Sequence, residues 1–160
     1  MINRVIDIHQ ISPDDIRRIG ESFFMEGGIP GKFNTAHFIT SLDAMVKSKL
    51  GAVWVATDNQ RVEGVMGGIA YPDLYTGAKC ALETFWYVMP EQRSGSLIIR
   101  LLNEFERWAT EENCQRIHIS CLTGWLSKKS NSSTAEQIAK FFERLGYKPI
   151  ETLYIKTLWQ

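Results

Sequence analysis

The chain has 160 residues, 44% of them hydrophobic, which is enough for one domain with a substantial core. Its 18 lysine and arginine residues equal its 18 aspartate and glutamate residues, so the formal net charge is zero and nothing indicates general binding to nucleic acids or anionic membranes. No apolar run is long enough to span a bilayer. We therefore expect a single domain over residues 1–160 and no membrane partner.

The cysteines and the first residues predict a cytoplasmic protein. The chain has three cysteines, an odd number, at positions that lack the spacing of metal ligands: Cys80, Cys114 and Cys121. Free thiols in a reducing compartment are the simplest interpretation. The start of the chain does not have the pattern of a signal peptide. A metal site built from Cys114, His118 and Cys121 is disfavoured, because alternation along a strand would point His118 and Cys121 to opposite faces.

Two amphipathic helices are predicted near the start, after a short strand at residues 5–8. Ser12 and Pro13, followed by two acidic residues, form a typical helix start, and the glycine-rich residues 27–31 end that helix. Asn34 or Thr35 can cap the second helix, and Gly51 would end it. Such a pair of helices either forms one wall of a ligand cleft or only covers a sheet.

Three strands are predicted next, at residues 52–56, 62–70 and 81–89. The second contains Gly64, Gly67 and Gly68, and glycines inside a strand mark a bulge or a close approach. The third is a run of β-branched, aromatic and apolar residues that ends at a proline, which is typical of a strand buried on both faces. The two tyrosines of the connection at residues 71–77 could line a substrate site or simply lie on the surface.

Residues 82–109 form the unit around which the chain is organised: a strand, a polar turn and an amphipathic helix. Apolar residues recur with helical spacing at Leu97, Ile98, Leu101, Leu102, Phe105 and Trp108. Ser94 or Ser96 can cap this helix. The N–H groups of a helix N-terminus can hold a phosphate, and Arg93 would add a positive charge beside them. Most such units bind nothing, however, and the known phosphate-binding signatures are absent.

The last third completes the predicted fold. A strand at residues 116–122 precedes a serine- and lysine-rich surface loop at 123–133, a helix that starts with a capping box at Thr134, and a final strand at 151–158. The element order is therefore β-α-α-β-β-β-α-β-α-β. It predicts an α/β (α+β mixed) fold with a central mixed, mostly antiparallel sheet and helices on both faces.

Residues 88–95 (V-M-P-E-Q-R-S-G) and the helix after them resemble the central motif of the GNAT superfamily, the acyl-CoA-dependent N-acetyltransferases. In that family a strand ending near V-x-P leads into [Q/R]-x-x-G-x-[G/A] and a helix. Residues 141–147 (F-F-E-R-L-G-Y) resemble the family's F-Y-E-K-L-G-F segment, and the phrase E-x-F-W-Y-V-x-P-E-x-R is similar to a branch common in phage and prophage genomes. The resemblance covers nearly the whole chain. It implies a GNAT-like fold and transfer of an acetyl group from acetyl-CoA to a primary amine.

The resemblance also implies which residues bind acetyl-CoA. Backbone N–H groups near Trp86 and Val88 would face the thioester and the pantetheine arm, and those of residues 93–98 would hold the pyrophosphate. The glycine pattern is incomplete, since Ser96 and Ile98, or Leu97 in the other alignment, stand where the family prefers small residues. The full set of expected cofactor-binding residues is Trp86, Val88, Arg93, Ser94, Gly95, Ser96, Leu97, Ile98 and Phe142.

Two residues are the catalytic candidates. Glu83 is a carboxylate in an otherwise apolar strand, so desolvation should raise its pKa towards that of a general base. A glutamate paired with an arginine, or one at an exposed strand end, is the alternative. The tyrosine with which the family protonates the leaving thiolate falls on Phe142, so Tyr147, another hydroxyl or water would have to serve. No cysteine lies at a convincing nucleophile position, which favours direct attack by the amine.

Two other functions stay open from the sequence. The departures from the family pattern at Ser96, Ile98 and Phe142 would suit a non-catalytic acyl-CoA-binding or regulatory domain. An exposed apolar patch around Trp125, Leu126 or Trp159 would suit a protein-interaction module without cofactor. The acceptor could be a small-molecule amine or an amine of a peptide. The loops at residues 27–33, 71–76 and 123–133 should select it. Many members of the family dimerise, so a homodimer is an alternative to a monomer.

Overall fold

The structure is a computed structural model that describes residues 1–120, 132–150, 156 and 158. The chain divides into two compact units. The larger unit contains residues 1–23 and 33–120, and the smaller unit contains residues 24–32 and the described residues beyond 120. The expectation of a single domain over residues 1–160 stays a prediction. None of the helices in the described part of the chain has the length and apolar character that crossing a membrane requires.

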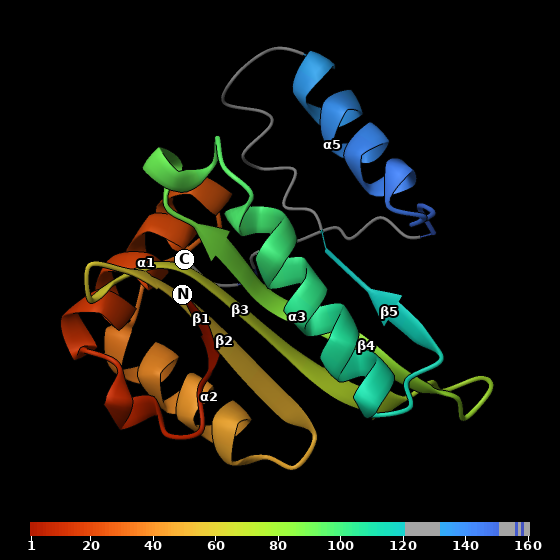
Figure 1. Ribbon diagram of the computed structural model, residues 1–160, viewed down its shortest axis with the longest axis horizontal. Coiled ribbons are helices and arrows are strands. Elements are labelled where there is room, and N and C mark those ends of the chain that lie inside the picture. The colour runs from red at the N-terminus through yellow and green to blue at the C-terminus, as the bar shows by residue number, and fades with distance from the viewer. Residues whose placement is uncertain (121–131, 151–155, 157, 159–160) are drawn as a thin grey trace. The chain divides into compact units, whose positions relative to one another are not determined.

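A five-stranded sheet forms the centre of the larger unit (Figure 1). Its strands follow one another across the sheet in chain order, with three antiparallel pairings and a final parallel pairing between β4 and β5. The bounds are β1 Ile2–Arg4, β2 Gly51–Asp58, β3 Arg61–Pro72, β4 Lys79–Val88 and β5 Arg116–His118. This confirms the predicted mixed, mostly antiparallel sheet.

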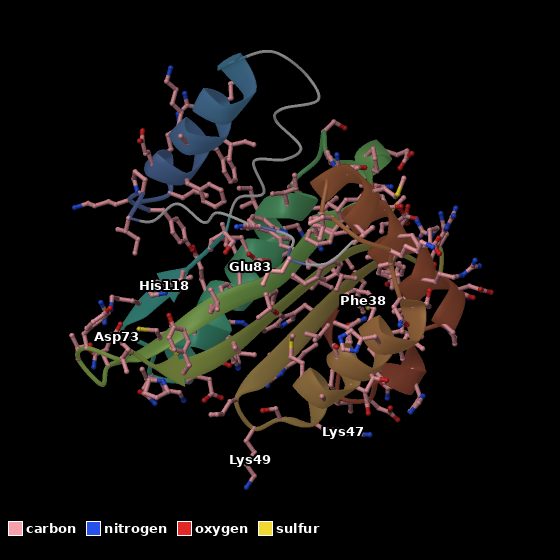
Figure 2. The ribbon with its side chains drawn as sticks, turned by 180° about the vertical axis from the view of Figure 1, so that it is seen from behind. Phe38, Lys47, Lys49, Asp73, Glu83 and His118 are labelled. Carbon is pink, nitrogen blue, oxygen red and sulfur yellow. The ribbon has the colours of Figure 1, made fainter. Side chains whose placement is uncertain are left out.

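Helices cover both faces of this sheet, as Figures 1 and 2 show from opposite sides. α1 (Pro13–Gly27) and α2 (Thr35–Lys47) lie on one face, and α3 (Leu97–Glu111) lies on the other. Short 3-10 turns, η1 (Ile8–Gln10) and η2 (Pro90–Gln92), precede α1 and α3. α5 (Ser132–Arg144) belongs to the smaller unit.

Two glycines of β3 show how closely the helices approach. A Cβ at Gly67 would lie 3.1 Å from the sulfur of Met45 in α2, and a Cβ at Gly68 would clash with the ring of Phe105 in α3. Neighbouring residues of a strand point to opposite faces, so the two glycines let a helix pack tightly on each side. The predicted close approach at these glycines is therefore confirmed.

The two faces bury different side chains. The face under α1 and α2 is mainly aliphatic, with Phe85 at its centre in edge contact with Phe23 and Phe38, at ring-centroid distances of 4.6 and 5.1 Å. The face under α3 is aromatic, because Trp54 packs edge-on against Phe105 and Trp108. Burying such aromatic surface is a major source of folding free energy, so α3 is firmly fixed to the sheet.

Several element boundaries correct the sequence prediction. The first strand covers residues 2–4 and not 5–8, because the side chain of Asp7 accepts a hydrogen bond from the N–H of His9 and starts η1. Gly51 begins β2 instead of ending α2, and a Cβ there would lie 2.5 Å from the carbonyl oxygen of Met45. Asn34 is the cap of α2, as one of the two alternatives predicted.

The C-terminal predictions are tested only in part. α5 begins at Ser132, two residues before the predicted cap Thr134, so the last two residues of the predicted loop at 123–133 belong to the helix. β5 ends at His118, before the predicted end at residue 122. The rest of that loop and most of the predicted strand at 151–158 lie outside the described residues, as does Cys121.

Candidate functional site

β5 pairs with only the first part of β4. β3 accompanies β4 from Lys79 to Val88, whereas β5 pairs with β4 only at Cys80, Ala81 and Leu82. Among the described residues, no strand pairs with this edge of β4 beyond Leu82. The edge of a sheet can add an extended ligand that carries amide groups of its own.

A β-bulge bends β4 at the point where β5 leaves it. Gly67 of β3 pairs with Phe85 and the next residue, Gly68, pairs with Glu83, so Thr84 is an extra residue in β4. A bulge of this kind changes the direction of a strand and is common beside active sites. Glu83 is therefore the last residue before β4 changes direction.

Glu83 is the only polar or charged side chain that is buried among the described residues, with 7% of its surface exposed. The backbone N–H of Ser120 donates a hydrogen bond to its Oε2 at 3.3 Å. Burial raises the pKa of Glu83 to about 7, and the hydrogen bond from Ser120 acts in the opposite direction. Among the described residues it forms no ion pair, so the alternatives of an arginine partner and of an exposed strand end are wrong in this part of the chain.

The connection from β4 to α3 ends in a turn, residues 93–96, which we call the β4–α3 turn. Ser96 occupies the N-cap position of α3, but its side chain makes no capping hydrogen bond. Among the described residues, no acceptor contacts the N–H groups of Leu97, Ile98 and Ile99. Ser96 is therefore the N-cap residue, as one of the two alternatives predicted, but without a capping side-chain hydrogen bond. The helix N-terminus has N–H groups and a partial positive charge available to an anion.

Arg93 fastens this turn to the end of β4. Its Nε donates a hydrogen bond to the carbonyl oxygen of Val88 at 2.8 Å, and its guanidinium lies 5.0 Å from the centre of the Tyr87 ring. The hydrogen bond and the cation–π contact hold a full positive charge beside the helix N-terminus.

Gly95 is not required by the fold of the turn. Its φ is not positive, and a Cβ would meet nothing closer than the carbonyl oxygen of Gln92, at 3.7 Å. Ser94, Gly95 and Ser96 are all exposed. Glycine at this position therefore leaves the backbone accessible for close approach by a ligand.

The predicted site residues fall into two groups. Glu83, Trp86, Val88 and residues 93–98 lie along β4 and the start of α3 in the larger unit. Phe142 and Tyr147 lie in the smaller unit, where their rings pack edge to face at 5.6 Å and the N–H of Tyr147 donates to the carbonyl oxygen of Phe142 at 3.0 Å.

A hydrogen-bonded pair that joins β3 to β5 was not predicted from the sequence. Tyr71 belongs to β3 and not to the following loop, and its hydroxyl lies 2.7 Å from Nδ1 of His118 in β5. Extending the predicted strand at 62–70 by one residue and placing it beside the next two predicted strands would have brought Tyr71 and His118 together. From the sequence, His118 was considered only as a metal ligand.

Residues 20–147 match the model of a protein family described as the acetyltransferase (GNAT) family. The fold is similar to that of a predicted acetyltransferase from Clostridium acetobutylicum solved with acetyl-CoA, at 15% identity and a TM-score of 0.72, over 99% of this chain and 97% of that one. It is also similar to a ribosomal-protein-alanine N-acetyltransferase from Brucella melitensis biovar Abortus 2308, at 11% identity and a TM-score of 0.67, over 99% of each chain.

A third similar structure is the aminoglycoside N-acetyltransferase AAC(6')-Iy in complex with CoA, at 15% identity and a TM-score of 0.70, over 98% of this chain and 93% of that one. No curated protein matches the chain in sequence. The three structures show that the fold is that of a GNAT acetyltransferase.

Proposed function

Since the chain belongs to the acetyltransferase (GNAT) family and is an acetyl-CoA-dependent N-acetyltransferase, we propose that Glu83 is its general base. An amine acceptor reaches the enzyme mostly as an ammonium ion and must lose a proton before its nitrogen can attack. The observation that carries the assignment is the burial of Glu83, which brings the pKa of its carboxyl group to about 7. A base works best when its pKa lies near the working pH.

Acetyl-CoA is proposed to lie along the edge of β4 that β5 leaves, passing Trp86 and Val88, with its pyrophosphate at the β4–α3 turn. Two features of the chain support this placement. β5 pairs with β4 only as far as Leu82, and a sheet edge beyond such a point can pair with the amides of the pantetheine arm. The turn offers uncapped N–H groups, the charge of Arg93 and the accessible backbone of Gly95.

Transfer is proposed to occur by direct attack of the amine on the thioester. A donor must also protonate the leaving thiolate, and Tyr147 is proposed for this role because Phe142 occupies the family's usual tyrosine position. The support for Tyr147 is its phenolic hydroxyl, since the family has an apolar residue at this position. Phe142 is proposed as a contact of the cofactor because the resemblance places it at the family's tyrosine position.

The acceptor is proposed to be a primary amine of a small molecule or peptide. The names of two similar structures support this class, one acting on aminoglycosides and the other on the alanine of a ribosomal protein. Membership of the family favours an enzyme over a non-catalytic domain or a module without cofactor. The single domain, the homodimer and the phage or prophage branch stay proposals from the sequence. The cytoplasmic location is also a proposal, and the free thiols of Cys80 and Cys114 agree with it.

The experiment measures CoA release from acetyl-CoA with three amines: sisomicin, spermidine and a lysine-containing peptide. We expect release that depends on one of these amines, and a loss of about 10²-fold or more in kcat for Glu83→Gln, as for removal of a general base. Glu21→Gln, at an exposed position of α1, is the matched control and should change nothing. A Glu83→Gln enzyme with the kcat of the parent would overturn the assignment.

A further inference from the structure

A phenylalanine of α3 packs where Glu83 would otherwise have a cross-strand neighbour. Gly68 of β3 pairs directly with Glu83 of β4. A Cβ at Gly68 would clash with Cε2 of Phe105 and would lie 3.1 Å from its Cδ2. Directly paired residues have their Cβ atoms about 5 Å apart, so the ring of Phe105 occupies the space beside the side chain of Glu83. Glycine at position 68 is what leaves room for the ring.

The register places Glu83 on the face of the sheet that α3 covers (Figure 1). Gly68 and Glu83 share a face because they are directly paired, and successive residues of a strand point to opposite faces. Leu82 and its β5 partner His118 therefore lie on the other face. Glu83 thus belongs to the aromatic side of the sheet, and the hydrogen-bonded pair of Tyr71 and His118 belongs to the opposite side.

Phe105 is a large apolar neighbour of Glu83 and is itself fully buried. Ala81, which lies two residues before Glu83 on the same face, is also buried but has only a methyl group. Glu83 keeps 7% of its surface exposed, so it is covered without being sealed from solvent. An apolar ring beside a carboxylate replaces water that would otherwise hydrate the charge.

Within the described part of the chain, no charge accounts for the raised pKa of Glu83. Its causes are burial, which raises the pKa, and the hydrogen bond from the N–H of Ser120, which lowers it. The titratable residues beside Phe105 in α3 are Glu104, which pairs with Arg107, and Glu106. The residues two positions from Gly68 in β3, and the β5 partner of Ala81, share this face and are apolar: Met66, Ala70 and Ile117.

We propose that Phe105 is a positioning residue of the acetyl transfer, because its ring shields the carboxylate of Glu83 from water on the side of α3. This inference rests on the proposed function. With the ring in place the carboxylate is poorly hydrated, so it takes a proton from an ammonium ion more readily than an exposed glutamate would. Phe105 is fully buried and acts through Glu83, whereas the exposed part of Glu83 is left for the amine.

The same helix offers a matched position for comparison. Leu101 lies about one helical turn before Phe105 and is equally buried. It also packs over a glycine of β3, since a Cβ at Gly64 would lie 3.0 Å from its Cδ1. Gly64 pairs with Val88, however, which is five residues along β4 from Glu83. Leu101 therefore shares the environment of Phe105 without covering the carboxylate.

The test follows the titration of Glu83 in the full chain by carbon NMR of its side-chain carboxyl group, with Glu83→Gln identifying the signal. Phe105→Leu leaves room for water beside the carboxylate, and we expect the pKa to fall by about half a unit or more towards its ordinary value. The bend in the pH dependence of kcat/KM, measured with the amine that the parent acetylates best, should move with it. Leu101→Val also loses buried apolar volume but should leave both unchanged.

Each outcome supports or overturns the inference. An unchanged pKa of Glu83 in Phe105→Leu overturns it, and so does an equal fall in Leu101→Val, while the proposed function survives in both cases. A pKa that falls in Phe105→Leu without a change in the bend of kcat/KM overturns the role of Glu83 and this inference together. Phe105→Met keeps more of the buried volume, and it provides the same test if Phe105→Leu does not fold.

Discussion

The buried carboxylate of Glu83 and the exposed β4–α3 turn lie in one continuous segment, yet they depend on the fold in opposite ways. Glu83 owes its raised pKa to burial, so its chemistry exists only while the surrounding sheet is packed. The binding proposed at the turn would use backbone N–H groups at a helix end, where residues 94–96 are exposed. A change at Glu83 should therefore alter the stability of the protein, whereas a change at Gly95 should alter binding alone.

The largest expected effect is on the free energy of unfolding as pH changes. The pKa of Glu83 is about 7 in the folded state, against an ordinary value of 4.5. The raised pKa therefore adds to the free energy of unfolding, and this contribution is fully present below about pH 4.5 and is lost as pH rises through 7. The loss amounts to about 3 kcal/mol, because each pH unit between the folded and unfolded pKa values corresponds to roughly 1.4 kcal/mol.

Urea unfolding of the parent and of Glu83→Gln at pH 5, 6, 7 and 8 measures this loss. The free energy of unfolding of the parent should fall relative to that of the variant up to about pH 7 and then level off. Two parallel curves would mean that the carboxyl group titrates as it does in the unfolded chain.

The next effect concerns binding at the turn. Gly95→Trp should weaken acetyl-CoA binding by about 10-fold or more, because a large side chain would occupy the space through which the pyrophosphate reaches the backbone. The melting temperature without ligand should stay within about 1 °C, since the position is exposed and its φ is not positive. Calorimetric titration with acetyl-CoA gives the affinity, and Gly95→Ala provides a smaller step. Unchanged affinity in Gly95→Trp would exclude the turn as the pyrophosphate site.

The smallest effect separates the two roles of Arg93. Arg93→Gln removes both the charge and the hydrogen bond to Val88, and should weaken acetyl-CoA binding by about fivefold, as expected for one phosphate contact. Arg93→Lys keeps the charge and should weaken binding by about twofold. Both variants lose the hydrogen bond and should lose about 1 kcal/mol of stability. If the two bind acetyl-CoA equally well, the charge of Arg93 has no part in binding.

The sequence predicted the features that depend on local patterns. The change from a continuous apolar run to helical spacing at Leu97 identified β4 and α3, and the glycines of β3 indicated the close approach of the helices. The position of Glu83 in an apolar strand was enough to predict its burial and its raised pKa. These features follow from residues that are neighbours in the chain.

The sequence did not predict the features that depend on strand register. A bulge was one alternative at the glycines of β3, but the extra residue is Thr84 of β4, and this position follows from the pairing of β4 with β3. The hydrogen bond from Ser120 to Glu83 follows from the departure of β5. The contact of Tyr71 with His118 joins residues 47 positions apart. The first strand was misplaced because residues 5–8 are nearly as apolar as a strand, although Asp7 starts a helical turn there.

The pH dependence of kcat/KM for parent and Glu83→Gln tests the central claim most directly, since it reports the titration of the free enzyme's base. The account predicts that kcat/KM of the parent rises with pH and bends near pH 7, and that this bend is missing in Glu83→Gln, leaving only the rise due to deprotonation of the amine itself. Profiles of the same shape in both enzymes would contradict the assignment of Glu83 as the general base.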